Sequence, residues 1–531
     1  MILNKYKNVL EFFILFIFVL YAYYSSIISG ISWDEFFVFN RGEERLKYLF
    51  SFGNSKITYD QNEFFPGLND SLAVFFTQLF PRNFEYVSLH IFNTSVSMLT
   101  LFGTYQLFKF LLNKRISKII FLILFFNPIF FSHMAINSKD TLISFSFVWL
   151  LLYFLKYLKH QGDKFKSKKI IYALLLFFTI GIGTRFHFVS LLILFIPFLL
   201  NNIYFEKKKL LIKKLFLNIF SVTIISFFIV VLFWPHTHSN IFFEPFNYFF
   251  ESLNLRTGPP IVFYNNEVID TMKVPTFFYF DNLIFRSPEF VIFLYLIFFI
   301  FILFDFNYFK NKYKNINLVL ISIFFIILYP FLIITFMKIP QYDGIRYFLF
   351  ILPFFSVVPS FALLYAIDNF NKFYLKISSL VIVFLFFYYL FYFFTFNPYQ
   401  YSYVSHLFLD KDKIANKFEN DYWGISIQEL IKKAVNENYL KKNKPILIGV
   451  CGFNVDIAKF ELNKYKNLNY KITSYEDSDV DFIIANNRAH FRSTKNDQSK
   501  WYSCYKKLSG FDYMSLSKGK IDLSRIYKIK N

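Results

Sequence analysis

Eleven long apolar stretches, separated by short charged loops, constrain this 531-residue chain more than any other feature of its sequence. Each is close to the ~17–25 residues that an α-helix needs to cross a bilayer. The composition agrees, because 56% of the residues are hydrophobic and 18% are charged, whereas a soluble chain has roughly 25% charged residues. We therefore predict a polytopic α-helical membrane protein. The expected spans lie near residues 10–30, 87–112, 117–136, 141–158, 169–184, 187–204, 213–234, 289–307, 317–337, 347–367 and 376–396.

The positions of the basic residues predict the topology. The net charge of +21 would indicate nucleic-acid binding in a soluble protein, but here the charges gather in alternate loops, so no nucleic-acid partner is expected. The first stretch is too long for a signal peptide and lacks a cleavage site, so we expect a retained anchor that starts in the cytoplasm. The basic loops are then cytoplasmic, as the positive-inside rule requires. They contain Lys114, Arg115, Lys118, six lysines between 156 and 169, Lys207, Lys208, Lys209, Lys213, Lys214, Lys310, Lys312, Lys314, Lys372 and Lys376.

An odd number of spans places the polar tail outside the cytoplasm. We expect a transmembrane domain at 1–396 and an extracytoplasmic domain at 397–531. A helical pattern at 425–435 and short strand-like runs at 446–450 and 481–485 predict a small α/β fold for this tail. Its two cysteines, Cys451 and Cys504, allow two interpretations. They form a disulfide, worth roughly 4 kcal/mol in the chain-entropy model, or they are two unrelated buried thiols.

Acidic residues on the outer side are candidates for chemistry. Asp34 and Glu35 open the first outer loop, 31–86, directly after the first span. Such a pair is costly next to lipid unless it faces water or a partner. It is either a solvated interfacial pair or a catalytic pair, in which one carboxylate takes a proton from an acceptor hydroxyl and the other orients that acceptor or binds a cation. Asp140, on the same side, caps the fourth span, contributes to the same site, or does both.

Three basic residues on the outer side run against the orientation bias. Arg185 interrupts an apolar hairpin at an outer turn, and Lys338 and Arg346 bracket a short outer loop. They reach toward lipid headgroups, or they bind an anionic group such as a phosphate. Acids and cations together suit the transfer of a group from a membrane lipid phosphate to an outer acceptor, and equally the vestibule of a transporter.

The pattern implies no cofactor. His236 and His238 place two imidazoles at i and i+2, but no third ligand follows in a metal-binding spacing. His133 is interpreted as an interfacial histidine. The nucleotide motifs, a Walker loop and a GxGxxG turn, are absent from the sequence. A divalent metal held by the carboxylates stays an open alternative.

Five motifs make the chain similar to a known family. Together they resemble the polytopic GT-C glycosyltransferases, in particular the dolichyl-phosphate-mannose protein mannosyltransferases (family 39) and their bacterial relatives. Ser138 replaces a proline of the family pattern, and Tyr347 replaces a histidine. The resemblance covers roughly residues 30–430. The motifs are WDE at 33–35, NP at 127–128 with NSKDT at 137–141, YDGIRYFLFILP at 342–353, NPYQYSY at 397–403 and DYWGIS at 421–426.

This resemblance implies a GT-C fold and a hexosyltransferase in the plasma (inner) membrane that uses a polyprenyl-phosphate sugar. An acceptor hydroxyl of a protein, lipid or glycan would attack the anomeric carbon on the outer face, with inversion. Membrane lipid would surround the donor's tail. The alternative is a lipid-linked sugar flippase or transporter. The implied residues are Asp34 as general base with Glu35 and Asp140 as further catalytic acids, Arg185, Lys338 and Arg346 for the donor phosphate, and Tyr342 and Asp343 as acceptor-binding or structural residues.

Overall fold

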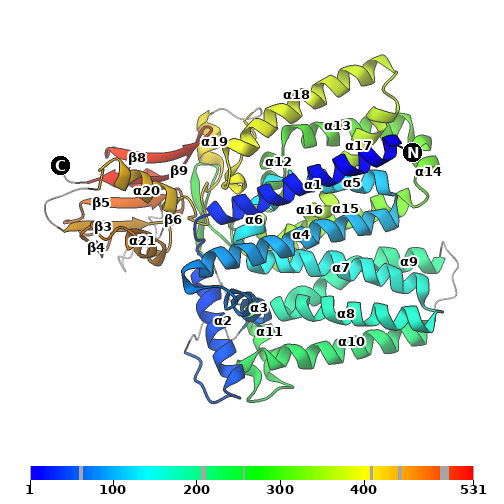
Figure 1. Ribbon diagram of the computed structural model, residues 1–531, viewed down its shortest axis with the longest axis horizontal. Coiled ribbons are helices and arrows are strands. Elements are labelled where there is room, and N and C mark those ends of the chain that lie inside the picture. Colours follow the sequence, from blue (N-terminus) through cyan, green and yellow to red (C-terminus); the bar gives the residue numbers. More distant parts are fainter. Residues whose placement is uncertain are drawn as a thin grey trace.

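A bundle of long, roughly parallel helices makes up most of the molecule, and a small sheet domain sits at one end of it (Figure 1). The computed structural model describes residues 2–58, 64–204, 211–254, 258–406, 411–440, 445–490 and 502–529. The lysines expected at 207–209 lie outside the described residues. The long helices are α1 (Ile2–Ile28), α4 (Glu85–Leu111), α7 (Ser138–His160), α8 (Lys164–Thr184), α10 (Ile212–Leu232), α13 (Glu289–Phe304), α15 (Ile316–Met337) and α18 (Phe373–Thr395).

Shorter helices complete the expected spans, so each of the eleven predicted stretches is helical. Within the described ranges, six helices are long and apolar enough to cross a membrane, or eight if each of two bent pairs is one span. The polytopic α-helical fold is thereby confirmed, while the number of crossings stays a prediction. The shorter helices are α5 (Lys114–Phe125), α6 (Pro128–Ile136), η3 (Phe186–Phe195), α9 (Ile196–Tyr204), α12 (Phe278–Phe285), α14 (Phe306–Lys312), η5 (Arg346–Ile351), α16 (Leu352–Phe355) and α17 (Val357–Asp368).

The bend of 68° between α5 and α6 has a local cause. Pro128 begins α6, and a proline disfavours the helical conformation of the residue before it. Asn127 is accordingly extended, with φ −72° and ψ 120°, and its side chain accepts a hydrogen bond from the backbone N–H of Phe130 at 3.0 Å. The chain therefore stops one helix and starts another inside the bundle, and α6 points the NSKDT segment toward the sheet domain.

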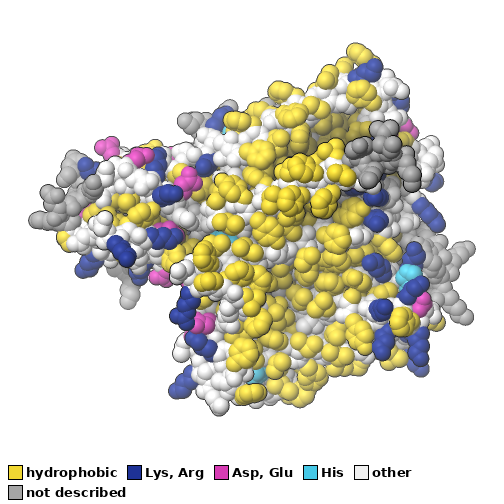
Figure 2. All heavy atoms as spheres, in the orientation of Figure 1, with side chains coloured by type: hydrophobic (Ala, Val, Ile, Leu, Met, Phe, Trp, Pro, Cys, Tyr) yellow, Lys and Arg dark blue, Asp and Glu magenta, His cyan; other side chains and the backbone are white. Residues whose placement is uncertain are grey.

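Burial separates the central helices from those that face lipid. α7 and α17 are almost entirely covered by other helices, whereas α1, α10 and α18 expose rows of large apolar side chains. Figure 2 shows this apolar surface as a broad band across the helical part. Soluble proteins rarely expose a contiguous apolar surface of this size to water, so the band is the surface that lipid covers.

Two short helices, α2 (Glu35–Phe50) and α3 (Leu68–Thr77), lie in the first outer loop. Asp70 on α3 binds two arginines of α2, Arg41 at 2.9 Å and Arg45 at 3.2 Å. Gly67 precedes α3 with φ +74°, and a Cβ there would lie 1.5 Å from the Arg45 guanidinium. Only glycine permits this close approach, so the loop is fixed by buried ion pairs above the helical bundle.

The C-terminal part forms a five-stranded mixed sheet in the order β4-β3-β5-β9-β8. β3 pairs in parallel with β4 and β5, and β9 pairs antiparallel with β5 and β8. The predicted helix and both strands are confirmed, and Cys451 and Cys504 form a disulfide. The domain boundary at 396 stays a prediction. The elements are α20 (Ile427–Asn436), β3 (Ile446–Cys451), α21 (Val455–Leu462), β4 (Tyr470–Thr473), β5 (Phe482–Asn486), β6 (Ala489–His490), β7 (Tyr502–Ser503), α22 (Cys504–Lys507), β8 (Tyr513–Lys518) and β9 (Ile521–Lys528).

A two-stranded hairpin and two further short helices connect these parts. The hairpin is antiparallel and pairs Ile261 with Asp270 at its open end. Its first strand lies beside Phe418, just before the sheet domain. These remaining elements are β1 (Ile261–Tyr264), β2 (Glu267–Asp270), α11 (Glu244–Asn254) and α19 (Lys411–Lys417).

Candidate active site

The predicted acids and two of the three predicted cations meet where the helical bundle touches the sheet domain. Asp34 is the residue before α2, and the backbone N–H of Trp33 donates to the Trp423 carbonyl at 2.9 Å. Through this bond the WDE and DYWG motifs, nearly four hundred residues apart in sequence, hold each other in place. The motifs of the first outer loop and of the C-terminal region therefore form one site.

Asp34 has the environment of a carboxylate held ionised at a wet surface. Its side chain is 34% exposed and lies 3.3 Å from the nearer guanidinium nitrogen of Arg346. It lines a small cavity with Glu35, Lys139 and Trp423. Burial alone would raise its pKa, but surrounding cations outweigh this and hold the pKa below its usual value. These cations are, in order of effect, Arg346, Lys139, Arg41 and Arg488.

Glu35 borders the same cavity but has a structural environment. It is 2% exposed, and its carboxylate accepts a hydrogen bond from the Ser32 N–H at 2.5 Å. Its other oxygen lies 2.8 Å from Nε2 of His90, whose Nδ1 donates to the Ser26 carbonyl at 3.1 Å. His90 forms an ion pair with Glu35 when both of its ring nitrogens carry a proton. These contacts bind the start of α2 to α4, and leave Glu35 no exposed surface for an acceptor.

Asp140 and Arg185 form a second ion pair of the site, 2.9 Å apart. Asp140 also accepts a hydrogen bond from the Asn137 amide at 2.9 Å. The expectation that Asp140 caps the helix is wrong in detail, because the side chain of Asn137 is the cap and accepts from the backbone N–H of Asp140. The Arg185 guanidinium lies 4.8 Å from the centre of the Tyr347 ring, and that of Arg346 lies 4.9 Å from the same ring. One aromatic ring therefore holds both cations together.

The YDGIR segment is a turn that places Asp343 and Arg346 side by side. Asp343 has φ 53° and Gly344 has φ 67°, a left-handed pair of residues that reverses the chain before η5. Asp343 is buried, and its carboxylate lies 3.2 Å from Arg346 and 2.9 Å from Arg488. The Tyr347 hydroxyl donates to that of Tyr342 beside them.

Lys338 is not brought into this group. It is the residue after α15, its side chain is exposed, and no ion pair joins it to any described residue. Its predicted role in donor binding has no structural support of its own, whereas Arg185 and Arg346 lie at the site.

His133 corrects a prediction. It is fully buried, not interfacial, and its Nε2 lies 3.1 Å from the Tyr422 hydroxyl while its Nδ1 lies 3.1 Å from the Asn137 amide. His238 likewise contacts the Tyr48 hydroxyl and a backbone carbonyl through its two nitrogens. Over the described ranges, no group of three or more His, Cys, Asp or Glu side chains is placed to bind a metal ion. The contacts of His133 and His238 therefore join segments that are distant in the sequence.

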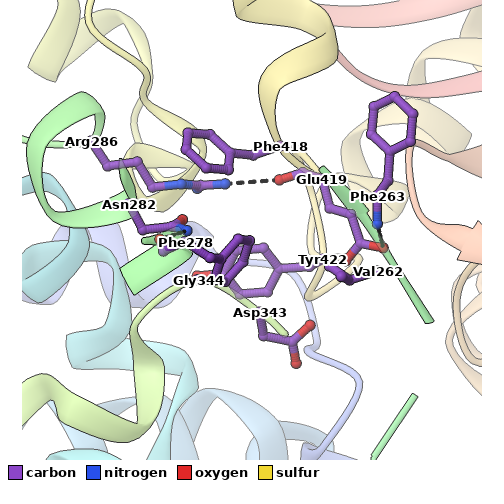
Figure 3. A pocket seen from close by; sticks show the side chains of 10 residues that line it. All are labelled: Val262, Phe263, Phe278, Asn282, Arg286, Asp343, Gly344, Phe418, Glu419 and Tyr422. Atoms are coloured by element: carbon purple, nitrogen blue, oxygen red, sulfur yellow. Dashed lines mark hydrogen bonds between the residues drawn. The ribbon is translucent and has the colours of Figure 1, made fainter. Parts of the chain in front are cut away.

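A second cavity is lined by several residues, among them Asp343, Arg286 and Glu419 (Figure 3). The carboxylate of Glu419 accepts hydrogen bonds from the backbone N–H groups of Phe263 at 3.2 Å and Ala489 at 3.0 Å. Burial raises the pKa of Glu419 to about 7, against the lowering effect of Arg488. This carboxyl group joins the β1 hairpin to the sheet domain, and it titrates near neutral pH.

Sequence reasoning missed three charged groups of the site. Lys139 stands inside the NSKDT motif but received no role, and Arg41 lies among other charges in the first outer loop. Arg488 had no signal at all, because it belongs to a stretch without a motif. Their proximity to Asp34 follows only from the packing of α2, α7 and the sheet domain.

Comparisons with known proteins agree with the motifs. Residues 69–234 match the family described as dolichyl-phosphate-mannose-protein mannosyltransferase. No curated protein matches at significant sequence similarity. Among solved structures, ArnT from Cupriavidus metallidurans is similar in its apo state, with 10% identity, 98% of each chain covered and a TM-score of 0.49. The same protein bound to undecaprenyl phosphate gives 10% identity, 97% and 98% coverage and a TM-score of 0.48.

The matched segment, 69–234, runs from the first outer loop through α10 and includes Asp140 and Arg185. It overlaps the NP and NSKDT motifs on which the resemblance was based. The predicted resemblance to the dolichyl-phosphate-mannose-protein mannosyltransferase family is confirmed over this part of the chain.

Proposed function

We propose that this protein is a membrane glycosyltransferase that moves a hexose from a polyprenyl-phosphate donor to an acceptor hydroxyl, with Asp34 as general base and with inversion at the anomeric carbon. The observation that carries the assignment of Asp34 is a difference among the three predicted acids. The side chain of Asp34 is 34% exposed, whereas those of Glu35 and Asp140 are buried at 3% and 4%.

The reaction follows from the charges at this site. The acceptor oxygen bonds to the anomeric carbon, the bond from that carbon to the phosphate oxygen breaks, and the acceptor proton goes to Asp34. A carboxylate with a low pKa is a weak base toward an alcohol. Proton transfer therefore comes late, when positive charge developing on the attacking oxygen has made the hydroxyl acidic.

The leaving phosphate gains negative charge, and fixed cations stabilise it most in the transition state. Arg185 and Arg346 both lie within 5 Å of the centre of the Tyr347 ring, at 4.8 Å and 4.9 Å, and are the cations placed to do this. Lys338 stays a predicted third cation. The reaction needs no nucleotide, and EDTA in the assay tests whether it needs a divalent metal.

The proposed topology has a cytoplasmic N-terminus and a site on the outer face of the plasma membrane. The N-terminus lies at the end of the bundle far from the sheet domain (Figure 1), and many Lys and Arg side chains gather at that same end (Figure 2). The positive-inside rule makes this end cytoplasmic. A reporter fused after residue 531 should therefore report outside, and a cytoplasmic signal would reverse the assignment.

Transfer is tested with purified protein, radiolabelled polyprenyl-phosphate hexoses and whole-cell acceptors separated into protein, lipid and glycan fractions. Label that leaves the donor and appears in one fraction identifies the acceptor class, and NMR of the product shows whether the anomeric configuration inverts. If every donor stays intact while labelled lipid crosses the bilayer of proteoliposomes, the protein is a transporter and the proposal fails.

A further inference from the structure

The sheet domain places one arginine directly against the helical site. Arg488 follows β5 and is 7% exposed. One of its terminal nitrogens donates to Asp343 at 2.9 Å, and the other donates to the backbone carbonyl of Tyr422. Its guanidinium lies 5.2 Å from the centre of the Trp33 ring. Arg488 therefore touches the first outer loop, the YDGIR turn and the DYWG motif at once.

Four side chains of alternating charge form a row that ends at Asp34. Each oxygen of the Asp343 carboxylate takes one guanidinium, Arg488 at 2.9 Å and Arg346 at 3.2 Å. Arg346 in turn uses its other terminal nitrogen for Asp34 at 3.3 Å. Two-point contacts of this kind fix orientation as well as distance, so the position of each member depends on the one behind it.

Contacts within the sheet domain fix the backbone around Arg488. The Cys504 N–H donates to the Arg488 carbonyl at 3.1 Å, and Cys504 is bonded to Cys451 at the end of β3. The side chain of Asn486 donates to the Asp421 carbonyl at 2.8 Å. Arg488 therefore stands just after β5, the central strand of the sheet, and this anchored backbone limits how far it can follow Asp343 if that residue moves.

We propose that Arg488 is a positioning residue for the transferase site, so that the sheet domain completes the catalytic geometry around Asp34 and Arg346. This inference rests on the proposed function. Without Arg488, Asp343 has one buried cation left to satisfy it, and Arg346 is drawn toward Asp343 and away from Asp34. The loss also removes one of the cations that lower the pKa of Asp34.

Several charged groups share this environment and enter any pH profile. Glu419 and Asp343 face Arg488 from the stretch before α20 and from the YDGIR turn. The groups that act on Asp34 come from α2, α7, η5 and the sheet domain, and they are Arg41, Lys139, Arg346 and Arg488.

The test compares Arg488→Gln with Arg525→Gln in the full-length protein. Arg525 is an arginine of the same domain whose ion pair, with Asp522 at 2.6 Å, stays within β9. Displacing a catalytic group by about 1 Å costs about 100-fold in rate, so we expect kcat to fall by about 10–100-fold for Arg488→Gln and to stay near wild type for Arg525→Gln.

The acid limb of the kcat/KM profile should also move to higher pH in Arg488→Gln, because a cation that favours ionised Asp34 is gone. Arg488→Lys keeps the charge but not the two-point contact. We therefore expect it to regain part of the activity, and its acid limb should lie close to the wild-type pH. If Arg488→Gln does not fold, Arg488→Lys alone carries the test. The expected result is then a kcat below that of the wild type and an acid limb close to its wild-type pH.

A double-mutant cycle with Asp343→Asn tests the route of the effect. If Arg488 acts through Asp343, the double variant should lose little more activity than the more damaged single variant. Losses that multiply, or an Arg488→Gln variant indistinguishable from Arg525→Gln, would overturn the proposal. Asp34→Asn separates the two inferences: equal activity of Asp34→Asn and wild type refutes the proposed function, whereas an inactive Asp34→Asn beside a fully active Arg488→Gln refutes only the positioning role.

Discussion

Replacing Arg346 with lysine keeps one positive charge at the site and removes the planar fork that carries it. The wild-type guanidinium joins Asp34 at 3.3 Å to Asp343 at 3.2 Å and lies 4.7 Å from the centre of the Trp423 ring. A lysine ammonium is a point charge on a flexible stem and cannot hold both carboxylates in this geometry. The variant therefore tests oriented charge separately from net charge.

The magnitude follows from what is lost. Removing one oriented group that stabilises developing charge costs ~10²–10³-fold in rate, or about 3–4 kcal/mol. The loss of folding stability should be smaller, about 1–2 kcal/mol, because Asp343 keeps its bond to Arg488. We therefore expect kcat/KM for the lipid donor to fall by about 100-fold or more in Arg346→Lys, in protein that is still folded at the assay temperature.

The assay measures initial rates over a range of polyprenyl-phosphate hexose concentrations, with thermal unfolding measured in parallel. Arg115→Lys is the matched control, because Arg115 also forms an ion pair, with Asp368 at 2.6 Å, but at the start of α5 and the end of α17, which the proposed topology places on the cytoplasmic side. It should keep donor kinetics close to wild type. Unchanged donor kinetics in Arg346→Lys would refute the reasoning and return Arg346 to a purely structural role.

Three further predictions concern stability. Glu35→Gln leaves the buried His90 imidazolium unpaired, so the free energy of unfolding should fall by about 3 kcal/mol while folded protein stays active; a lost activity at an unchanged Tm would make Glu35 catalytic. Glu419 has a pKa raised from 4.5 to about 7, so wild-type stability should fall as pH rises through that window, by about 3 kcal/mol, and Glu419→Gln should lack this slope in thermal melts; an equal slope would contradict it. Removing the Cys451–Cys504 disulfide, which spans 53 residues, with a double serine variant should cost about 4 kcal/mol, and an unchanged melting midpoint would refute that estimate.

The helices could be predicted because the bilayer restricts which backbone structures can cross it. Backbone polar groups in a bilayer must be satisfied within the segment, so an apolar stretch of span length is helical. Strands β3 and β5 were also recognisable, because short apolar runs bounded by polar residues are typical of buried strands. The bend at Asn127 was visible in principle from Pro128, although its angle depends on the helices packed around it.

The arrangement within the site was harder to predict. Asp34 and Glu35 are adjacent in sequence, yet the side chain of Asp34 is 34% exposed and that of Glu35 is buried against His90. Sequence order cannot separate these two environments. Arg488 and Asp343 are separated by 145 positions in the sequence, and their contact exists because the sheet domain packs against the bundle. Pairings of this kind need the three-dimensional fold.

The central claim is that Asp34 takes the acceptor proton in a sugar transfer from a lipid phosphate. Its most direct test measures turnover and donor binding side by side for wild type and Asp34→Asn in the same lipid vesicles. Asparagine keeps the size of the side chain and removes its basicity. We expect turnover to fall by at least about 100-fold while donor binding stays nearly unchanged. Turnover close to wild type in Asp34→Asn would contradict it.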